Sequence, residues 1–328
     1  MSLLQQPPAQ RRNAVRTAAN RHVRNSAALL RRVAKPEYVY RPSQIARRLA
    51  RGPRSHWREE AVIDLPWGHR LIVRPGDDIG SALWRFGVYD LLVTELIWCL
   101  GEFGDQMLDI GANIGYMSSV MSGRIGPDGR VYAFEPIPSL FNDLTSNISL
   151  WPFQNVTGRP FALSDRTGDA EILLPRMFER NHGIATLQTD TPFVLDGVSE
   201  RLVIQAVRYD DLDESRRSIG VAKIDVEGHE LHVLRGAARS LDAHRIRDLI
   251  YEDHTDFPNE TSRLLEDFGY TIFTTHRTFG GARIHESGSG ERSQSGFDPP
   301  SMLATLDPTR AKRRLSHRGW AALSSRIS

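Results

Sequence analysis

The sequence predicts an α/β fold in which a mostly parallel sheet carries helices on both of its faces. The apolar segment Met107–Ile110 ends in a glycine turn at Gly111 and leads into a helical pattern. A second strand pattern ends at an acid, Glu135, 24 residues after Gly111. Strand and helix patterns then alternate as far as residue 253. This alternation is typical of parallel strands that are joined by helical crossovers.

The individual elements follow from apolar periodicity and from turn residues. We expect parallel strands at 106–110, 130–135, 155–162, 219–225 and 247–253, and helices near 114–123, 137–150 and 229–242. Before them, the sequence predicts a hairpin over 61–73 with its turn at 66–69, and one or two helices over 79–100. An insertion over 166–210 has antiparallel strand patterns at 171–174 and 202–207, and closing strands are expected at 271–275 and 281–285.

Charge divides the chain of 328 residues into three parts. Residues 1–55 form a basic N-terminal extension, partly disordered or helical, with a charge of about +12, and residues 307–328 carry about +5. The total is +2, so the segment 55–306 is acidic, near −15. We therefore expect a folded domain over 56–286 and a flexible basic tail over 287–328. The extension could contact an anionic surface such as a membrane or nucleic acid.

Several classes of protein are disfavoured by composition. No apolar run approaches 18 residues, so no transmembrane segment is expected. The N-terminus shows no apolar region typical of a secretory signal peptide, so we do not expect a secreted protein. A single cysteine, Cys99, rules out a disulfide framework within one chain and fits a cytoplasmic location. Because Cys99 lies in the apolar run 91–100, we expect a buried helix position rather than a nucleophile.

The glycine motif indicates which ligand the first turn binds. Dinucleotide-binding turns have the pattern G-x-G-x-x-G, whereas here Gly111 is followed by Asn113 and Gly115 and preceded by Asp109. A carboxylate at the strand end disfavours a pyrophosphate and favours a cation, such as the sulfonium and ammonium of S-adenosylmethionine. Glu135 would accept hydrogen bonds from ribose hydroxyls. The alternative is that the two glycines merely allow tight packing of strand and helix.

A second motif, over 221–230, places three acids after an apolar strand. Asp225 and Glu227 follow the strand and would lie at the same sheet edge as Asp109 and Glu135. Their mutual repulsion suggests a bound cation, a hydroxyl substrate or an arginine partner. The alternatives are that Lys223 is a strand residue paired with an acid, that Glu230 is a helix-start charge and that His229 is a capping or surface residue.

These motifs resemble those of the FkbM family of S-adenosylmethionine-dependent methyltransferases. The resemblance covers about residues 77–275, and its motifs are Leu108-Asp-Ile-Gly-Ala-Asn-Ile-Gly-Tyr116, Ala133-Phe-Glu-Pro136, Asn155-Val156, Ala162-Leu-Ser-Asp165, Lys223-Ile-Asp-Val-Glu-Gly-His-Glu230, Val233-Leu-Arg-Gly-Ala237 and Leu249-Ile-Tyr-Glu252. It implies a Rossmann-like class I methyltransferase fold for the domain 56–286. It also implies methylation of oxygen on a small-molecule acceptor, often a sugar or a secondary-metabolite hydroxyl.

The resemblance also implies roles for individual residues. The donor site would include Asp109, Gly111, Asn113 and Gly115 along methionine and ribose, Glu135 at the ribose hydroxyls, and Ser164 and Asp165 or the backbone at Ala162 near adenine. Asp225 would lie beside the reacting methyl group. The resemblance does not fix the catalytic base.

Methyl transfer to an alcohol needs a group that removes the hydroxyl proton. Our candidates for this catalytic role are Asp225, Glu227 and His229, and the second choices are Glu252, His254 and His182. A divalent metal on Asp225, Glu252 and a third oxygen would be a substitute for the base, but it is not favoured and no metal ligand is assigned. The rival functions are an RNA-directed methyltransferase that uses the basic extension and, less favoured, a nucleotide-dependent oxidoreductase.

Overall fold

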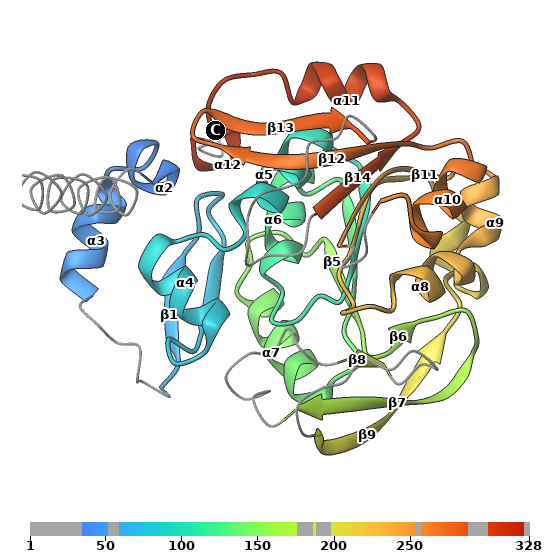
Figure 1. The fold of residues 1–328 in the computed structure, drawn as a ribbon. Coiled ribbons are helices and arrows are strands. Elements are labelled where there is room, and N and C mark those ends of the chain that lie inside the picture. Colours follow the sequence, from blue (N-terminus) through green and yellow to red (C-terminus); the bar gives the residue numbers. More distant parts are fainter. Residues whose placement is uncertain are drawn as a thin grey trace, which may run out of the picture.

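An eight-stranded sheet forms the centre of the protein (Figure 1). The computed structural model describes residues 35–51, 59–175, 186–187, 198–252, 257–287 and 301–324. The strand order is β13-β12-β14-β11-β10-β3-β4-β5. Five neighbouring strands run parallel: β5 (Val156–Arg159), β4 (Arg130–Phe134), β3 (Gln106–Ile110), β10 (Ile219–Ile224) and β11 (Ile246–Glu252). The predicted mostly parallel α/β sheet is thereby confirmed.

Helices cover both faces of this sheet, as predicted. On one face, α5 (Leu91–Leu100) and α6 (Tyr116–Ile125) pack against Met107, Val131 and Val221. On the other, α8 (Glu230–Gly236) and α9 (Ala238–Asp242) pack against the next residue of each strand: Leu108, Tyr132 and Ala222. Successive strand residues point to opposite faces, so one set of strands supplies two cores. Two further helices complete the layers: α7 (Pro138–Ser149) and α10 (Glu260–Asp267).

The N-terminal part of the domain packs on the α6–α7 side. A hairpin of β1 (Ala61–Asp64) and β2 (Arg70–Val73) turns at the predicted place and is followed by α4 (Asp78–Phe86). The indole of Trp151, beyond α7, donates a hydrogen bond to the Arg70 carbonyl oxygen at 2.9 Å. His69 is fully buried and meets Ser122 Oγ at 2.9 Å. The hairpin is therefore tied to the helices that follow β3 and β4.

The C-terminal segment corrects the prediction of a flexible tail over 287–328. Residues 301–324 contain β14 (Ser301–Thr305), α11 (Pro308–Arg314) and α12 (Ala321–Ser324). All five residues of β14 are buried, and the strand lies antiparallel between β11 and β12 (Thr271–Thr278). β14 follows a Gly- and Ser-rich stretch and lies beyond the strand–helix alternation that ends at residue 253, so no local pattern identifies it as a strand of the sheet. Beyond β12, β13 (Gly281–Glu286) closes the sheet, as predicted.

The second, smaller sheet belongs to the predicted insertion. Its order is β6 (Ala162–Leu163), β9 (Val198–Val207), β7 (Gly168–Pro175) and β8 (Thr186–Leu187). β7 and β9 pair antiparallel with Ile172 opposite Leu202, which confirms the pairing expected from the sequence. The insertion therefore begins with β6, directly after the edge strand β5 of the main sheet.

Part of the basic extension packs on the domain. It contains α2 (Pro36–Val39) and α3 (Ser43–Arg51). The buried Tyr38 ring lies 6.0 Å from the Phe86 ring, and Glu37 Oε1 lies 2.7 Å from an Arg277 guanidinium nitrogen. The folded part thus begins before the hairpin. The predicted contact with an anionic surface depends mainly on residues 1–34, which lie outside the described residues.

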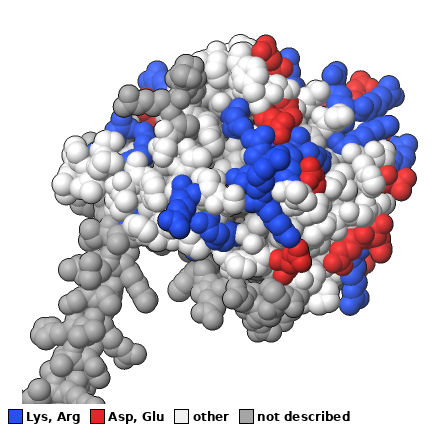
Figure 2. All heavy atoms as spheres, turned by 90° about the horizontal axis from the view of Figure 1, so that it is seen from above, with Lys and Arg blue, Asp and Glu red and all other residues white. Residues whose placement is uncertain are grey.

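The basic charge of the C-terminal segment is largely paired with acids. Arg314 lies 2.8 Å from Glu102, and Arg310 lies 2.9 Å from both Glu102 and the buried Asp248. Figure 2, which views the molecule from the side of α11, shows Lys and Arg side chains with Asp and Glu beside them. Three of the five basic side chains described in this segment, Arg310, Lys312 and Arg314, are therefore paired with acids. Within the described residues, no helix is long and apolar enough to cross a membrane.

Candidate active site

The carboxyl ends of the parallel strands bring the predicted acids to one edge of the sheet. Asp109 ends β3, Glu135 follows β4, Asp225 follows β10 and Glu252 ends β11. β10 lies between β3 and β11, and Asp109 is in register with Lys223. Ligands of open α/β sheets bind along this edge.

Glu135 is held in place by two backbone amides. Its Oε2 accepts a hydrogen bond from the Asn113 amide at 2.8 Å, and its Oε1 accepts one from the Ile137 amide at 2.9 Å. The side chain is buried, and burial raises the pKa of Glu135 to about 7. Each carboxylate oxygen can accept a second hydrogen bond. Glu135 thus joins the glycine turn to the end of β4 and retains acceptor capacity for a diol.

The two motif glycines are required by packing. Gly111 has φ +78°, and a Cβ there would lie 2.0 Å from the Asp225 carbonyl oxygen. Gly115 has φ +90°, and a Cβ there would lie 2.7 Å from Leu144 Cδ1 of α7. Both positions therefore favour glycine for conformation and for space. The alternative that the glycines allow tight packing against a helix holds at Gly115, whereas the near neighbour of Gly111 is the backbone that follows β10.

Lys223 joins the ends of β3 and β10. Its Nζ donates to the Gly111 carbonyl oxygen at 2.9 Å and lies 3.2 Å from Asp225 Oδ2 and 3.6 Å from Asp109 Oδ1. Burial alone would lower the Lys223 pKa, but the charges of Asp225 and Asp109 outweigh it and raise the pKa. The alternative that Lys223 is a strand residue paired with an acid is thus confirmed, and the ammonium holds the two motifs together.

Asp109 is fully buried beneath this ammonium. Ser118 Oγ donates to its Oδ2 at 2.5 Å, whereas its buried Oδ1 accepts no hydrogen bond. Burial raises the pKa of Asp109, and Lys223 opposes that effect. An unsatisfied buried carboxylate oxygen beside a glycine turn is unusual and marks a position where a donor or a cation would be stabilised.

A cluster of acids faces Lys223 from three strand and helix ends. Burial, followed by the charges of Asp225, Asp90 and Glu227, raises the pKa of Glu252 to about 9. Burial and the charges of Asp225 and Glu230 raise the pKa of Glu227 to about 8. Asp90, which caps α5, also belongs to this cluster because its charge acts on Glu252. Like charges that raise one another's pKa favour a cationic or proton-donating ligand.

The loop that carries Glu227 is held in an uncommon conformation. Glu227 has φ +52°, in the left-handed region that non-glycine residues rarely adopt. Glu230 turns back from the start of α8, and its Oε1 accepts hydrogen bonds from the amides of Val226 at 3.2 Å and Gly228 at 3.3 Å. Glu230 therefore fixes the loop, which goes beyond the helix-start role that the sequence suggested. Such local strain is concentrated at functional sites.

His229 contacts residues on the β6 side of the site. Its Nε2 lies 3.0 Å from Ser164 Oγ, and its ring stacks on His232 at 4.6 Å. His232 Nδ1 in turn lies 2.8 Å from Asp165 Oδ2. Burial, and then the charge of His232, lower the pKa of His229 to about 4, so the ring is a weak base at neutral pH.

Most of the predicted residues thus lie along one edge, in two groups. Asp225 and Glu227 lie with Glu252, whereas His229 lies with Ser164 and Asp165. Sequence reasoning missed Asp90 and His232; the sequence signal for His232 is its place three residues after His229, on one side of a helix. His182 and His254 lie outside the described residues.

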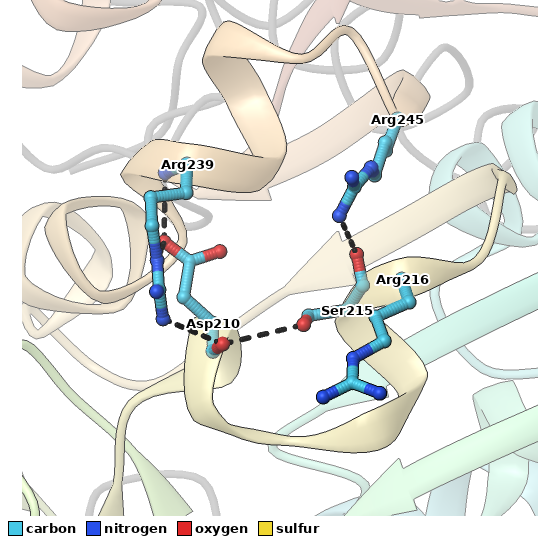
Figure 3. A pocket seen from close by; sticks show the side chains of 5 residues that line it. All are labelled: Asp210, Ser215, Arg216, Arg239 and Arg245. Atoms are coloured by element: carbon cyan, nitrogen blue, oxygen red, sulfur yellow. Dashed lines mark hydrogen bonds and ion pairs between the residues drawn. The ribbon is translucent and has the colours of Figure 1, made fainter.

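A separate pocket of about 400 Å³ lies away from this edge (Figure 3). It is lined by Asp210, Ser215, Arg216, Arg239 and Arg245, which come from the 3₁₀ helices Tyr209–Asp211 and Asp213–Arg216 and from the neighbourhood of α9. The Arg245 carbonyl oxygen accepts from the amide of Ile219, the first residue of β10, so the pocket is at the amino end of the sheet. Asp210 accepts from the amides of Arg239 and Ser240. The polar groups that line this pocket thus hydrogen-bond within the protein, at the sheet edge opposite the acid cluster.

A comparison with known families decides the identity of the chain. The methyltransferase FkbM domain matches residues 109–272, half of the chain, from the end of β3 into β12. The chain belongs to the FkbM methyltransferase family. It is therefore an S-adenosylmethionine-dependent methyltransferase with a Rossmann-like class I fold, and the oxidoreductase alternative is wrong. The matched segment includes the glycine turn, Glu135 and the acid motif after β10.

The chain is also similar to individual methyltransferases. The chain is 30% identical over 179 residues to hexuronic acid methyltransferase AglP of Haloferax volcanii, a match that covers 53% of this chain and 67% of AglP. It is 37% identical over 54 residues to protein-L-isoaspartate O-methyltransferase of Ignicoccus hospitalis, over 16% of this chain and 26% of that protein. Among solved structures, Aeropyrum pernix fibrillarin with bound S-adenosyl-L-methionine aligns with a TM-score of 0.35 at 18% identity, over 76% of this chain and 95% of that one.

The residues at the sheet edge fit the methyl donor. The buried carboxylate of Asp109 and the acids around Asp225 suit a ligand that carries two positive charges. Glu135, held by two amides, suits a vicinal diol. An anionic pyrophosphate would be repelled by the same groups.

Proposed function

We propose that this enzyme methylates a hydroxyl oxygen of a small molecule, either a sugar or a secondary metabolite, and that it acts in the cytoplasm. The observation that carries the proposal is the cluster of Asp225, Glu227 and Glu252 around Lys223 at the edge next to the glycine turn. S-adenosylmethionine would supply a methyl group on a positively charged sulfur, and this sulfur would leave when the acceptor oxygen attacks the methyl carbon from the opposite side.

The donor half of the proposal uses the first motif and the start of the insertion. Asp109, Gly111, Asn113 and Gly115 would line the methionine and ribose, and Glu135 would accept from the ribose hydroxyls. Ala162, Ser164 and Asp165 would lie near the adenine. The support is the hydrogen bond that links Glu135 to the Asn113 amide, and the contact of Ser164 with α8 through His229.

The acceptor half uses the second motif. Asp225 is the residue we favour as base, because its side chain is about one-third exposed and Lys223 holds one of its oxygens at 3.2 Å. The other oxygen can face an acceptor hydroxyl. Glu227 is the alternative, and its raised pKa makes it a proton carrier near neutral pH. His229 stays in the proposal as a third candidate, although its lowered pKa disfavours it.

The charge of the cluster favours a hydroxyl over a carboxylate as the acceptor. The relative AglP is named for a hexuronic acid, which offers both kinds of oxygen. A carboxylate acceptor would add another negative charge beside Asp225 and Glu252, which already repel each other. A neutral hydroxyl can instead donate a hydrogen bond to these acids.

Two alternatives are weaker on specific grounds. An RNA acceptor would bring phosphates towards an acidic edge, which opposes binding. A divalent metal on Asp225 and Glu252 would compete with the Lys223 ammonium, which already neutralises Asp225. A metal-dependent mechanism is therefore less favoured than one in which a carboxylate acts as the base.

The test is product analysis with methyl-labelled donor and a panel of acceptors that includes neutral and hexuronic acid glycosides. We expect the label in a product that is stable to mild alkali, as an ether is. Label that alkali releases as methanol would identify a carboxylate acceptor and contradict the proposal. Asp225→Asn should lower turnover by about 10²–10⁴-fold, whereas Asp128→Asn, in an exposed turn, should not. An equal loss in His229→Gln alone would move the base to His229.

A further inference from the structure

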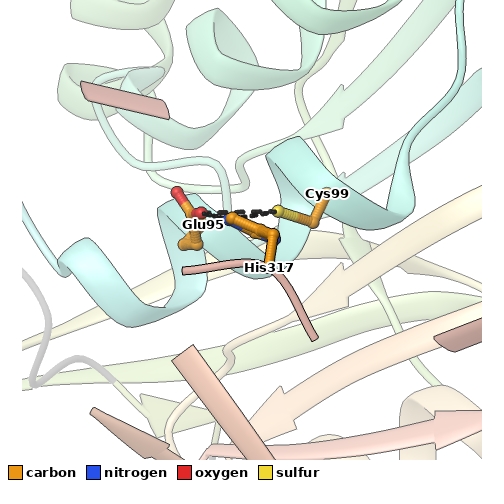
Figure 4. A group of neighbouring side chains, drawn as sticks. All are labelled: Glu95, Cys99 and His317. Atoms are coloured by element: carbon orange, nitrogen blue, oxygen red, sulfur yellow. Dashed lines mark hydrogen bonds and ion pairs between the residues drawn. The ribbon is translucent and has the colours of Figure 1, made fainter. Parts of the chain in front are cut away.

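A Glu–Cys–His cluster lies on the α5 face, apart from the acid cluster (Figure 4). Glu95 and Cys99 are one turn apart on α5, and His317 comes from the segment between α11 and α12. Within the described part of the chain it is the one group of three such side chains whose ligand atoms converge. We propose that Glu95, Cys99 and His317 bind a zinc ion that ties the C-terminal segment to α5.

The distances between the three ligand atoms suit one tetrahedral ion. Cys99 Sγ lies 3.4 Å from Glu95 Oε1 and 3.9 Å from His317 Nε2, and these last two atoms are 2.8 Å apart. Usual zinc bond lengths and tetrahedral angles place sulfur about 3.5 Å from either partner and nitrogen about 3.3 Å from oxygen. Shifts of about 0.5 Å or less would therefore complete the geometry.

The tautomer of His317 is suited to metal binding. Its Nδ1 lies 3.0 Å from the Arg314 carbonyl oxygen, which can only accept, so Nδ1 carries a hydrogen. A neutral ring then has a lone pair on Nε2, directed at Glu95 Oε1. Two lone pairs at 2.8 Å repel each other, and a cation bound by both atoms would remove that repulsion. A backbone carbonyl that orients a histidine in this way is a common feature of metal sites.

The surroundings of Glu95 and Cys99 also fit a bound dication. Glu95 is fully buried, and the amides of Ala321 at 2.7 Å and Ala322 at 2.9 Å hold its two oxygens. Zinc binding would release the thiol proton, and the thiolate and carboxylate together would neutralise the ion. The His317 side chain is 35% exposed, so water can supply the fourth ligand.

The test uses the full chain, freed of metal with a chelator and titrated with Co²⁺ and then Zn²⁺. Because Cys99 is the only cysteine, a thiolate-to-cobalt charge-transfer band can come from no other residue. We expect that band at one equivalent, its loss on adding Zn²⁺, and a rise in Tm of about 2 °C or more with Zn²⁺. A wild-type protein without the band would overturn the proposal and leave the contact of His317 with Glu95 as a structural one.

Variants separate this site from adventitious binding. Cys99→Ser and His317→Ala should each weaken Zn²⁺ binding by at least about tenfold, measured against a competing chelator. His285→Ala, an exposed histidine on β13, is the matched control and should bind like the wild type. Equal Zn²⁺ affinity in all of these proteins would contradict the assignment. An unchanged Tm of the wild type on adding Zn²⁺ would also contradict it.

Discussion

At the scale of single residues, Gly111 is the position where sequence and structure are most closely connected. Its Cβ would meet the Asp225 carbonyl oxygen at 2.0 Å, so the glycine lets the ends of β3 and β10 approach each other. Gly104 offers a matched control because it has nearly the same φ, +79° against +78°, and no atom within 4 Å of the added Cβ.

We predict that Gly104→Ala costs about 1 kcal/mol of unfolding free energy, the usual penalty of the left-handed conformation. Gly111→Ala should cost about 1–3 kcal/mol more, because the backbone after β10 must move. Denaturant unfolding of both variants measures the difference. Equal losses would show that the β3–β10 contact is not tight.

A second residue-scale prediction concerns pH. Glu252 has a pKa of about 9 in the folded protein against an ordinary value of 4.5, so the folded state binds a proton that the unfolded state has lost. Its contribution to stability is therefore present at low pH and is lost as pH rises from about 4.5 to about 9. We expect the Tm of the free enzyme to fall over this range, and to fall less in Glu252→Gln. An identical pH profile in the two proteins would contradict the raised pKa.

At the scale of elements, the sequence predicts the parallel strands well but misses β14. The strands at 106–110, 130–134 and 219–224 are apolar runs bounded by turns, so period and length both identify them. β14 lies beyond the strand–helix alternation, and its place in the sheet is fixed by its partners β11 and β12, which no local pattern reveals. The same holds for the site: motif residues are predictable, but the approach of Asp90 to Glu252 depends on tertiary packing.

The buried position of β14 gives an element-scale prediction. Leu303 is fully buried in this strand, whereas Val203 on β9 is 64% exposed. Leu303→Ala should cost about 2–5 kcal/mol of unfolding free energy, and Val203→Ala should change it by no more than about 0.5 kcal/mol. Urea unfolding measures both. A small effect at Leu303 would mean that residues 301–324 form the flexible tail that the sequence suggests.

At the scale of the whole molecule, the described part of the N-terminal extension packs on two separate elements of the domain, β12 and α4. Glu37 of α2 binds Arg277 of β12, and Tyr38 packs on Phe86. A protein that begins at residue 56 should therefore melt at a lower temperature than one that begins at residue 35. Donor affinity should be the same in both, because the acid cluster and glycine turn lie elsewhere. Equal melting temperatures would show that α2 contributes no stability.

The whole account depends on the placement of the donor at the edge formed by β3, β4 and β10. Isothermal titration of S-adenosylmethionine into the wild type, Glu135→Gln and Asp128→Asn tests it most directly. Glu135→Gln removes the charge that would bind the ribose hydroxyls and should weaken the donor by about 1.5–3 kcal/mol, or about 10–150-fold in Kd. Asp128→Asn removes an exposed carboxylate and should bind as the wild type does. Wild-type affinity in a folded Glu135→Gln protein would contradict this placement of the donor.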